Sequence, residues 1–469
     1  MTLSSTLGGV IVGLACSLCA AGEAIDVGSR LELFVDDHLI ERMTDARLVL
    51  HHPATRQVAI DHNEPWEGNI CCGHTVFEDG DLYRMYYRGR HYDEQAGQET
   101  HWFSCYAESN DGVHWTKPEL GLVEFRGSKR NNILLEGQTR FNLAPFKDLN
   151  PNCKPDERYK AMTNGRGGMD AYKSPDGIHW SPMVEGHVIT KGAFDSLNLA
   201  FWDPLRGCYL EYHRGFRDGV RDVMTGTSED FLHWTDPVWI EYPGSPPQHL
   251  YTNAIKPYYR APHILLGFPK RFVPGRQGVP HRHSGVSDAV LITSRDGLSF
   301  HRWDEAFIRP GLQPERWVNR NNYPAWGLVV TPSDLPGAPD ELSLYTTEGY
   351  YTGESCQLRR HTIRIDGFVS VQAPLAGGEM ATRPLVFDGK ELVMNFSTSA
   401  AGSIRVEIEE ADGQPIPGFT LDDSPEIFGD AIERVVAWRA DSDLSALRGK
   451  PVRLRFVLKD ADLYSIRFR

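Results

Sequence analysis

One segment of the sequence combines aromatic and amide side chains in a way that suits sugar recognition. Residues 317–327 read WVNRNNYPAWG. Aromatic rings stack on the faces of pyranose sugars, and side-chain amides form hydrogen bonds with sugar hydroxyl groups. Packing between neighbouring β-sheets is the competing interpretation. It stays open for Trp317 and Tyr323, and it is favoured for Trp326.

Cationic and amide side chains also gather near the predicted ends of strands. If these strand ends face one another, the pocket between them is cationic, which suits an anionic sugar such as a uronate or a sulfated residue. A surface or structural role is the alternative for each residue, because Arg and His often bridge sheets. Lys270 belongs to this set. The candidate substrate-binding residues are Trp66, His74, Arg88, Asn198, Arg214, Asn253, Arg271, Asn322, Tyr323 and Glu348.

Other kinds of chemistry find less support. The sequence has no G-x-S-x-G nucleophile motif and no phosphate-binding glycine loop. The HRH tripeptide at residues 281–283 lies in a Gly/Pro-rich loop without an acidic ligand, so a metal site there is not favoured. Cys71 and Cys72 are predicted to be small buried residues or members of separate disulfides. We expect no cofactor and no catalytic metal, and a structural cation stays an alternative.

The first residues predict export. An apolar stretch from residue 7 to 21 precedes Gly22 and Ala24, which are placed like a signal-peptidase site, so residues 1–24 are predicted to be a cleaved signal peptide. A transmembrane anchor is the rival interpretation. Cleavage leaves a net charge of −13 and six cysteines. This acidic balance argues against a nucleic-acid partner, and no later stretch is long enough for a membrane span. The predicted location is periplasmic or extracellular.

A repeated turn indicates the elements that must position these side chains. The segments SNDGVHW, SPDGIHW, SEDFLHW and SRDGLSF begin at residues 109, 174, 228 and 294, and a fainter IDGFVSV begins at residue 365. Ser and Asp cap backbone amides in tight turns, Gly supplies a positive φ, and the following aromatic residue is expected to insert between sheets. The Asp residues of these turns are therefore predicted to be structural. The Asp residues of successive repeats are 54 to 70 residues apart, a spacing that fits one four-stranded blade per repeat.

The sequence around each turn is rich in β-branched and aromatic residues and lacks helical periodicity. We therefore predict an all-β protein, with a five-bladed β-propeller at residues 25–373 closed into a ring without free sheet edges. After residue 373 the pattern changes to alternating apolar and polar residues. Residues 374–469 are predicted to form a small C-terminal β-sandwich.

The repeat, the signal peptide and the C-terminal sandwich resemble the superfamily of five-bladed propeller glycosidases that includes invertases, levansucrases, arabinanases and xylosidases. Over nearly the whole mature chain, the segments are also similar to a branch of exported bacterial proteins that is labelled hydrolase-like. Sialidases carry a similar Asp box in a six-bladed propeller, and the blade number separates the two groups. In the resembled family, three acidic residues project into a central funnel from the innermost strands of the first three blades.

The resemblance implies three catalytic carboxylates. The segment APFKDLNP places Asp148 in the orienting role, and FDSLNLAFWDP places Asp195 near the general-acid position. In the first blade the family's nucleophile position falls on Cys71. Glu67 is the preferred replacement because it precedes the innermost strand, and the alternatives are the acids at positions 36 and 37.

The expected function is glycoside hydrolysis of an oligo- or polysaccharide, with Asp195 as proton donor and Glu67 as base or nucleophile. Since Cys71 stands where an acid is expected, a non-catalytic carbohydrate-binding propeller is the main alternative. A lyase or phosphorylase that uses His and Arg groups of the same funnel is a third possibility.

Overall fold

The computed structural model describes residues 24–93, 95–137, 142–439 and 442–469. The predicted signal peptide, apart from Ala24, lies outside the described residues, so its cleavage stays a prediction. Within the described part of the chain, no helix has the length and apolar character needed to cross a bilayer. The helices described there are 3₁₀ turns: η1 (Pro155–Glu157), η2 (Pro314–Trp317) and η3 (Ser445–Leu447).

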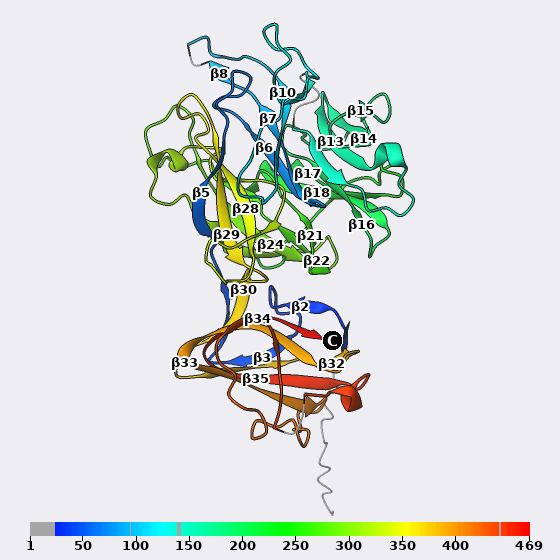
Figure 1. Cartoon of the computed structure of the whole chain (residues 1–469), viewed down its shortest axis with the longest axis vertical. Coiled ribbons are helices and arrows are strands. Elements are labelled where there is room, and N and C mark those ends of the chain that lie inside the picture. Colours follow the sequence, from blue (N-terminus) through cyan, green and yellow to red (C-terminus); the bar gives the residue numbers. More distant parts are fainter. Residues whose placement is uncertain (1–23, 94, 138–141, 440–441) are drawn as a thin grey trace, which may run out of the picture.

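Five sheets follow one another along the chain and form the predicted five-bladed propeller, the upper part of Figure 1. The strands are, for blade 1, β6 (Cys72–Asp79), β7 (Leu82–Gly89), β10 (Phe103–Ser109) and β11 (Ile133–Glu136); for blade 2, β12 (Ala144–Lys147), β13 (Tyr159–Gly165), β14 (Gly168–Ser174) and β15 (Ser181–Pro182); for blade 3, β16 (Leu199–Asp203), β17 (Cys208–Arg217), β18 (Val220–Ser228) and β19 (Val238–Trp239); for blade 4, β20 (His249–Leu250), β21 (Lys256–Tyr258), β22 (Ala261–Gly267), β23 (Lys270–Val273), β24 (Val286–Ser294) and β25 (His301–Ile308); for blade 5, β26 (Tyr323–Pro324), β27 (Val329–Thr331), β28 (Glu341–Glu348), β29 (Gln357–Arg364) and β5 (Ala54–Asp61). A short hairpin of β8 (Tyr92–Asp93) and β9 (Gln98–Glu99) projects from blade 1.

The ring closes through a strand that precedes blade 1 in the sequence. β5 pairs antiparallel with β29, so blade 5 combines segments from both ends of the propeller sequence. The innermost strands of blades 1 and 5 also touch, because the amide of Val76 donates to the carbonyl of Trp326 at 2.8 Å. This closure covers strands that would otherwise expose unpaired backbone groups.

Each predicted Ser/Asp corner is a hydrogen-bonded turn, which we call a box turn. In the first, Ser109 Oγ accepts the amides of Asp111 and Gly112, and Asp111 Oδ1 accepts those of Val113 and His114. Although burial opposes it, donors from the turn hold the pKa of Asp111 below its ordinary range. The turns that begin at residues 174, 228 and 294 repeat this pattern. The structural role predicted for these aspartates is confirmed.

The aromatic residues after the second and fourth box turns pack against the preceding blade, as expected. The Trp180 ring lies 6.2 Å from the ring of Tyr86 in blade 1, measured between centroids. Phe300 of blade 4 lies 6.1 Å from Tyr212 of blade 3. These edge-to-face pairs join neighbouring blades.

The faint fifth repeat at residues 365–371 does not form a box turn. Asp366 instead accepts hydrogen bonds from Tyr258 Oη at 2.6 Å, Ser465 Oγ at 2.9 Å and Asn395 Nδ2 at 3.1 Å. This buried carboxylate therefore ties blade 4 to the C-terminal part of the chain.

Ten strands outside the propeller form one hydrogen-bonded sheet, which we call the second module (lower part of Figure 1). The module has its own core, to which Val27, Phe34, Phe456 and Leu458 belong. Its strands are β1 (Ile25–Gly28), β2 (Leu31–Leu33), β3 (Ile40–Thr44), β4 (Arg47–Leu50), β30 (Val369–Ala373), β31 (Gly378–Thr382), β32 (Leu385–Phe387), β33 (Leu392–Glu410), β34 (Asp430–Val435) and β35 (Val452–Phe468).

The strand pairing corrects the predicted boundary at both ends of the propeller. β1 pairs with β32, β2 with β35 and β4 with β30, so residues 25–50 and 369–373 belong to the second module. The physical reason is that the N-terminal strands carry apolar residues that are buried in the second module's core. Position in the sequence does not show which sheet an isolated strand joins.

Candidate functional site

The two ends of the propeller differ in chemical character. In blade 1, Ser109 and its box turn lie at one end of the strands, and the paired residues Cys72 and Arg88 lie at the other. Ser228 and Arg214 are separated in the same way in blade 3. We call the first the box-turn end and the second the cationic end.

Basic side chains meet tyrosines at the cationic end. Arg88 Nη2 donates to Tyr350 Oη at 2.6 Å, and Arg320 Nη1 donates to Tyr351 Oη at 3.0 Å. The guanidinium of Arg214 lies 4.8 Å from the centre of a further tyrosine ring, that of residue 251. These contacts place positive charge beside tyrosine hydroxyl groups and, at Arg214, beside a ring face, an arrangement suited to holding an anionic sugar. The cationic end is defined by Arg88, Arg214, Lys270, Arg320, Tyr251, Tyr323 and Tyr350.

Lys270 is the most unusual group at this end. It is 1% exposed, and its side chain makes no hydrogen bond or ion pair with a described residue. Its Nζ lies 4.7 Å from the ring centre of Tyr251 and 5.7 Å from that of Tyr323. Burial, followed by the charge of Arg320, holds the pKa of Lys270 well below its usual range. An anionic ligand would supply the missing counter-charge. It would therefore offset both the burial of the Lys270 amine and its repulsion by Arg320.

Asp195 lies at the cationic end with its carboxylate accessible. Its side chain is 72% exposed and forms an ion pair with Arg214. Its backbone carbonyl accepts a hydrogen bond from Tyr251 Oη at 2.9 Å. Of the three carboxylates expected to act together, Asp195 is the one that a sugar can reach.

Glu67 is sealed inside blade 1. Its side chain has no exposed surface and accepts hydrogen bonds from Tyr87 Oη and, at 2.7 Å, from Lys117 Nζ. Burial alone would raise the pKa of Glu67, but His62 and Lys117 lower it to about 2. The role of base or nucleophile expected for Glu67 is therefore not supported. Cys71, which stands at the expected acid position, is also fully buried, and burial raises the pKa of its thiol.

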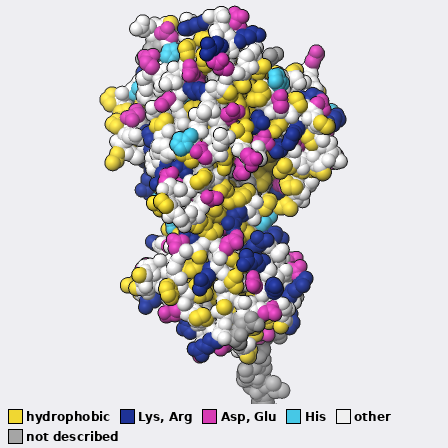
Figure 2. Space-filling view, viewed as in Figure 1, with side chains coloured by type: hydrophobic (Ala, Val, Ile, Leu, Met, Phe, Trp, Pro, Cys, Tyr) yellow, Lys and Arg dark blue, Asp and Glu magenta, His cyan; other side chains and the backbone are white. Residues whose placement is uncertain are grey.

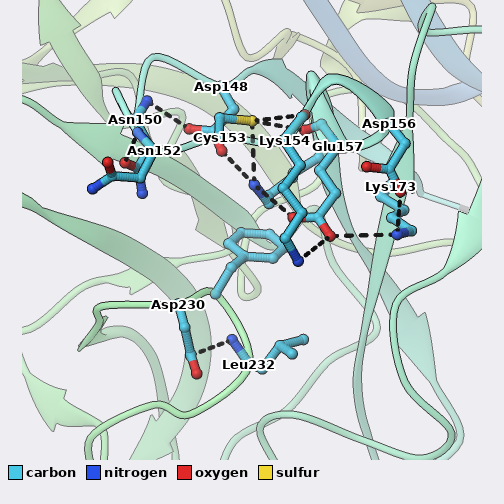
Figure 3. Close-up of polar contacts among 12 residues, drawn as sticks. Asp148, Asn150, Asn152, Cys153, Lys154, Asp156, Glu157, Lys173, Asp230 and Leu232 are labelled. Atoms are coloured by element: carbon cyan, nitrogen blue, oxygen red, sulfur yellow. Dashed lines mark hydrogen bonds and ion pairs between the residues drawn. The ribbon is translucent and has the colours of Figure 1, made fainter.

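Asp148 is likewise enclosed by protein groups (Figure 3). Its side chain has no exposed surface and is paired with Lys160. Tyr209 Oη donates to its Oδ2 at 2.7 Å, and the amide of Asn150 donates to its Oδ1 at 2.9 Å. The carboxylate therefore holds strands of blades 2 and 3 together.

Asp148 and Asp195 lie at opposite ends of the propeller. Asp148 contacts Tyr209, which pairs with Ser228 at the box-turn end, whereas Asp195 contacts Arg214. Tyr209 and Arg214 are five residues apart on β17, a rise of roughly 16 Å. The expected group of three facing carboxylates is therefore not formed. Asp148 directly follows β12, the innermost strand of blade 2, and this end of the strand faces away from the cationic end. The family pattern therefore does not bring Asp148 to the site.

The predicted amide residues bind the protein's own backbone. Asn198 Nδ2 donates to the carbonyl of residue 194 at 3.0 Å, Asn253 Nδ2 to that of residue 212 at 3.2 Å, and Asn322 Nδ2 to that of residue 287 at 2.8 Å. All three side chains are buried. They fix the connections that lead into the innermost strands.

Four further predicted residues are occupied by protein partners. Their positions in the sequence gave no indication of this, because the partners come from other strands or blades. The pairs are His74 with His62 (2.9 Å between Nε2 atoms), Trp66 with Asn132 (2.6 Å), Arg271 with Asp288 (2.6 Å), and Glu348 with Arg359 (2.8 Å) and Arg316 (3.2 Å).

No group of three or more His, Cys, Asp or Glu among the described residues is arranged to hold a metal ion. In the HRH tripeptide, His281 Nε2 lies 3.2 Å from the carbonyl of Tyr351, and the His283 ring stacks on the Tyr351 ring at 4.1 Å. The six described cysteines are free, so Cys71 and Cys72 are buried thiols rather than members of disulfides.

Two tyrosines of the cationic end, Tyr251 and Tyr350, were not identified from the sequence, and both contact its basic side chains. Glu99 was not identified either; it is one-third exposed and pairs with Arg90, two residues after Arg88. The sequence did contain a signal for Tyr251, because this residue lies between β20 and β21 of blade 4. Glu99 lies in the short β8–β9 hairpin, which carries no repeat pattern.

No protein-family model and no curated protein sequence matches the chain. Solved structures of glycoside hydrolases superpose on about two thirds of it. They include the endo-arabinase of Bacteroides thetaiotaomicron (TM-score 0.39, 11% identity, 66% of this chain and 98% of that chain) and the α-L-arabinofuranosidase of Podospora anserina (TM-score 0.42, 9% identity, 67% and 98%). The α-L-arabinofuranosidase domain of Coprinopsis cinerea gives a TM-score of 0.38, with 8% identity over 67% and 99%. Scores this low assign neither an activity nor a substrate.

Proposed function

We propose that this protein acts on an anionic oligo- or polysaccharide, whose carboxylate or sulfate groups bind at the cationic end of the propeller. The observation that carries the proposal is the buried, unpaired Lys270 among Arg88, Arg214 and Arg320. An anionic group would favour the protonated form of the Lys270 amine, whereas a neutral sugar would leave that amine without a counter-charge. The tyrosine rings beside it supply stacking surfaces for pyranose faces.

Glycoside hydrolysis is the reaction we propose at this site, with Asp195 as the proton donor. A general acid must reach the leaving oxygen, and the exposed Asp195 carboxylate satisfies that condition. Since Glu67 and Asp148 are sealed, a second carboxylate must come from the surface of the cationic end. Glu99, with a side chain 33% exposed, is the candidate that we propose in place of Glu67.

The test is turnover of uronate-containing oligosaccharides by the wild-type protein and by Asp195→Asn. We expect the variant to lose about 100-fold or more in kcat, because general acid catalysis contributes 10²–10⁴-fold. Its affinity for the anionic sugar should not fall, because the change removes a negative charge beside Arg214, whose side chain is only 3% exposed. Asp156→Asn, a change of another exposed aspartate at the box-turn end, is the matched control. Unchanged kcat in Asp195→Asn would exclude Asp195 as the donor.

Binding without cleavage is the second candidate function. It is favoured by the burial of Glu67 and Asp148, which leaves Asp195 without either of the two carboxylates expected to act with it. Wild-type protein that binds the oligosaccharide and releases no product over long incubation would establish this function. Measurable product from the wild type would exclude it.

Export is also part of the proposal. Its support is the apolar stretch at residues 7–21 followed by a small-residue cleavage pattern. N-terminal sequencing of the protein recovered from culture medium or periplasm should give a chain that begins near Ile25. An uncleaved chain retained in the membrane fraction would favour the anchor instead.

A further inference from the structure

A cavity of about 400 Å³ lies on the propeller axis at the box-turn end, away from the cationic end. The innermost strands of all five blades contribute to its wall, and no residue of the second module lines it. A volume of this size falls in the range of small-molecule sites. Apolar side chains dominate the wall, notably Phe77, Phe146, Phe201, Trp202, Tyr258 and Trp326.

The rim of the cavity is apolar as well. Leu149 and Tyr259 line it and are 65% and 51% exposed. Figure 2 shows hydrophobic side chains gathered on this part of the propeller, just above the narrow waist that leads to the second module. Large apolar side chains left exposed around a cavity are typical of ligand-binding sites.

One unpaired charge lies in this apolar wall. Lys256, which is half-buried, makes no hydrogen bond or ion pair with a described residue. The other lysine of the cavity, Lys147, is paired with Asp79 at 2.6 Å. Glu78 also lines the cavity but is exposed to solvent. Burial lowers the pKa of Lys256 to about 8, so its amine is still mostly protonated at neutral pH.

We infer that this cavity binds a small aromatic carboxylate, whose ring lies against Trp202, Tyr258 and Trp326 and whose anionic group pairs with Lys256. The wall offers stacking surface for a flat apolar body, and Lys256 offers a single charge-assisted hydrogen bond in a poorly hydrated place. The ligand class differs from the sugar proposed for the cationic end. The inference therefore does not depend on the proposed function.

Calorimetric titration with 2-naphthoate and 2-naphthamide tests the inference, because the two probes share one ring system and differ in charge. The wild type should bind naphthoate one to one, about 10-fold or more tighter than naphthamide. Lys256→Met should remove that preference and leave the affinity for naphthamide unchanged. Trp202→Ala should weaken both probes, because the stacking surface serves both.

Two matched variants locate the binding. Lys147→Met changes a lysine of the same cavity that already has a partner, and it should keep naphthoate affinity within about threefold. Lys270→Met removes the unpaired lysine of the cationic end and should have no effect. Equal affinity for the two probes, no binding, or loss of binding in Lys270→Met rather than Lys256→Met would each overturn the inference. Melting curves of every variant confirm that it is folded.

Discussion

At the scale of single residues, the groups that a polar side chain faces in the folded protein decide whether a ligand can reach it. The cationic end contains Arg88, Arg214 and Tyr323. In contrast, the side-chain amides of Asn198 and Asn253 donate hydrogen bonds to backbone carbonyls. Both kinds of residue are predicted with the same logic, because each lies near the end of a strand. Their surroundings depend on contacts between blades, which residue type does not reveal.

Glu67 should make the fold sensitive to acid. Its pKa is about 2 in the folded protein and about 4.3 in an unfolded chain. A lowered folded pKa stabilises the protein above the unfolded value, and that contribution, on the order of 3 kcal/mol, is lost as the pH falls from about 4.3 to about 2. We expect the melting temperature of the wild type to fall more steeply in this window than that of Glu67→Gln.

The control for this measurement is Glu78→Gln, which changes an exposed glutamate of the next strand. It should follow the wild-type slope, although Glu67→Gln starts from a lower stability at neutral pH because Lys117 loses its partner. Equal slopes for all three proteins would mean that the Glu67 carboxylate is not held ionised in the fold.

At the scale of elements, the repeat predicts blades well because box turns depend on hydrogen bonds within seven residues. Four turns lie where the Ser/Asp/aromatic pattern places them. The N-terminal strands were not predictable, since β2 pairs with β35 at the far end of the chain. The fifth corner failed for a related reason: Asp366 is recruited by the second module.

The third box turn shows how packing outweighs backbone strain. Phe231 has φ of 70°, where the other turns have glycine, such as Gly112 at 70° and Gly177 at 80°. The left-handed conformation costs a non-glycine residue about 1–2 kcal/mol. Phe231 is nevertheless fully buried, with its ring 5.2 Å from that of Tyr209, and truncating a buried Phe costs about 3–5 kcal/mol.

Phe231→Gly should therefore lower the free energy of unfolding by about 1–4 kcal/mol, as measured by urea denaturation. Phe428→Gly, a change of a 68% exposed phenylalanine, should have a much smaller effect. A more stable Phe231→Gly protein would show that strain, not packing, dominates this turn.

At the scale of the whole molecule, both ends of the described chain contribute strands to the second module, and the propeller sequence lies between them. Residues 25–50 supply four of its ten strands, and Val27, Phe34, Leu39 and Ile40 lie in its core. The predicted C-terminal unit, residues 374–469, is thus incomplete. It lacks the strands that cover β32 and part of β35.

A fragment of residues 374–469 should not melt cooperatively, because it exposes an unpaired strand edge and apolar core residues. Addition of a peptide of residues 24–50 in trans should restore a cooperative transition, followed by circular dichroism. A peptide of the same composition in scrambled order serves as the control. Cooperative melting of the fragment by itself would show that the N-terminal strands are dispensable.

Recognition of anionic sugars by the cationic end can be measured by calorimetry with a matched pair of sugars. A uronic-acid tetrasaccharide and its carboxyl-reduced, neutral counterpart differ only in charge. We predict that the wild type binds the acidic form about 10-fold or more tightly, that added salt reduces this preference, and that Lys270→Met abolishes it while Lys173→Met at the box-turn end retains it. Equal affinity of the wild type for the two sugars would contradict the proposed recognition.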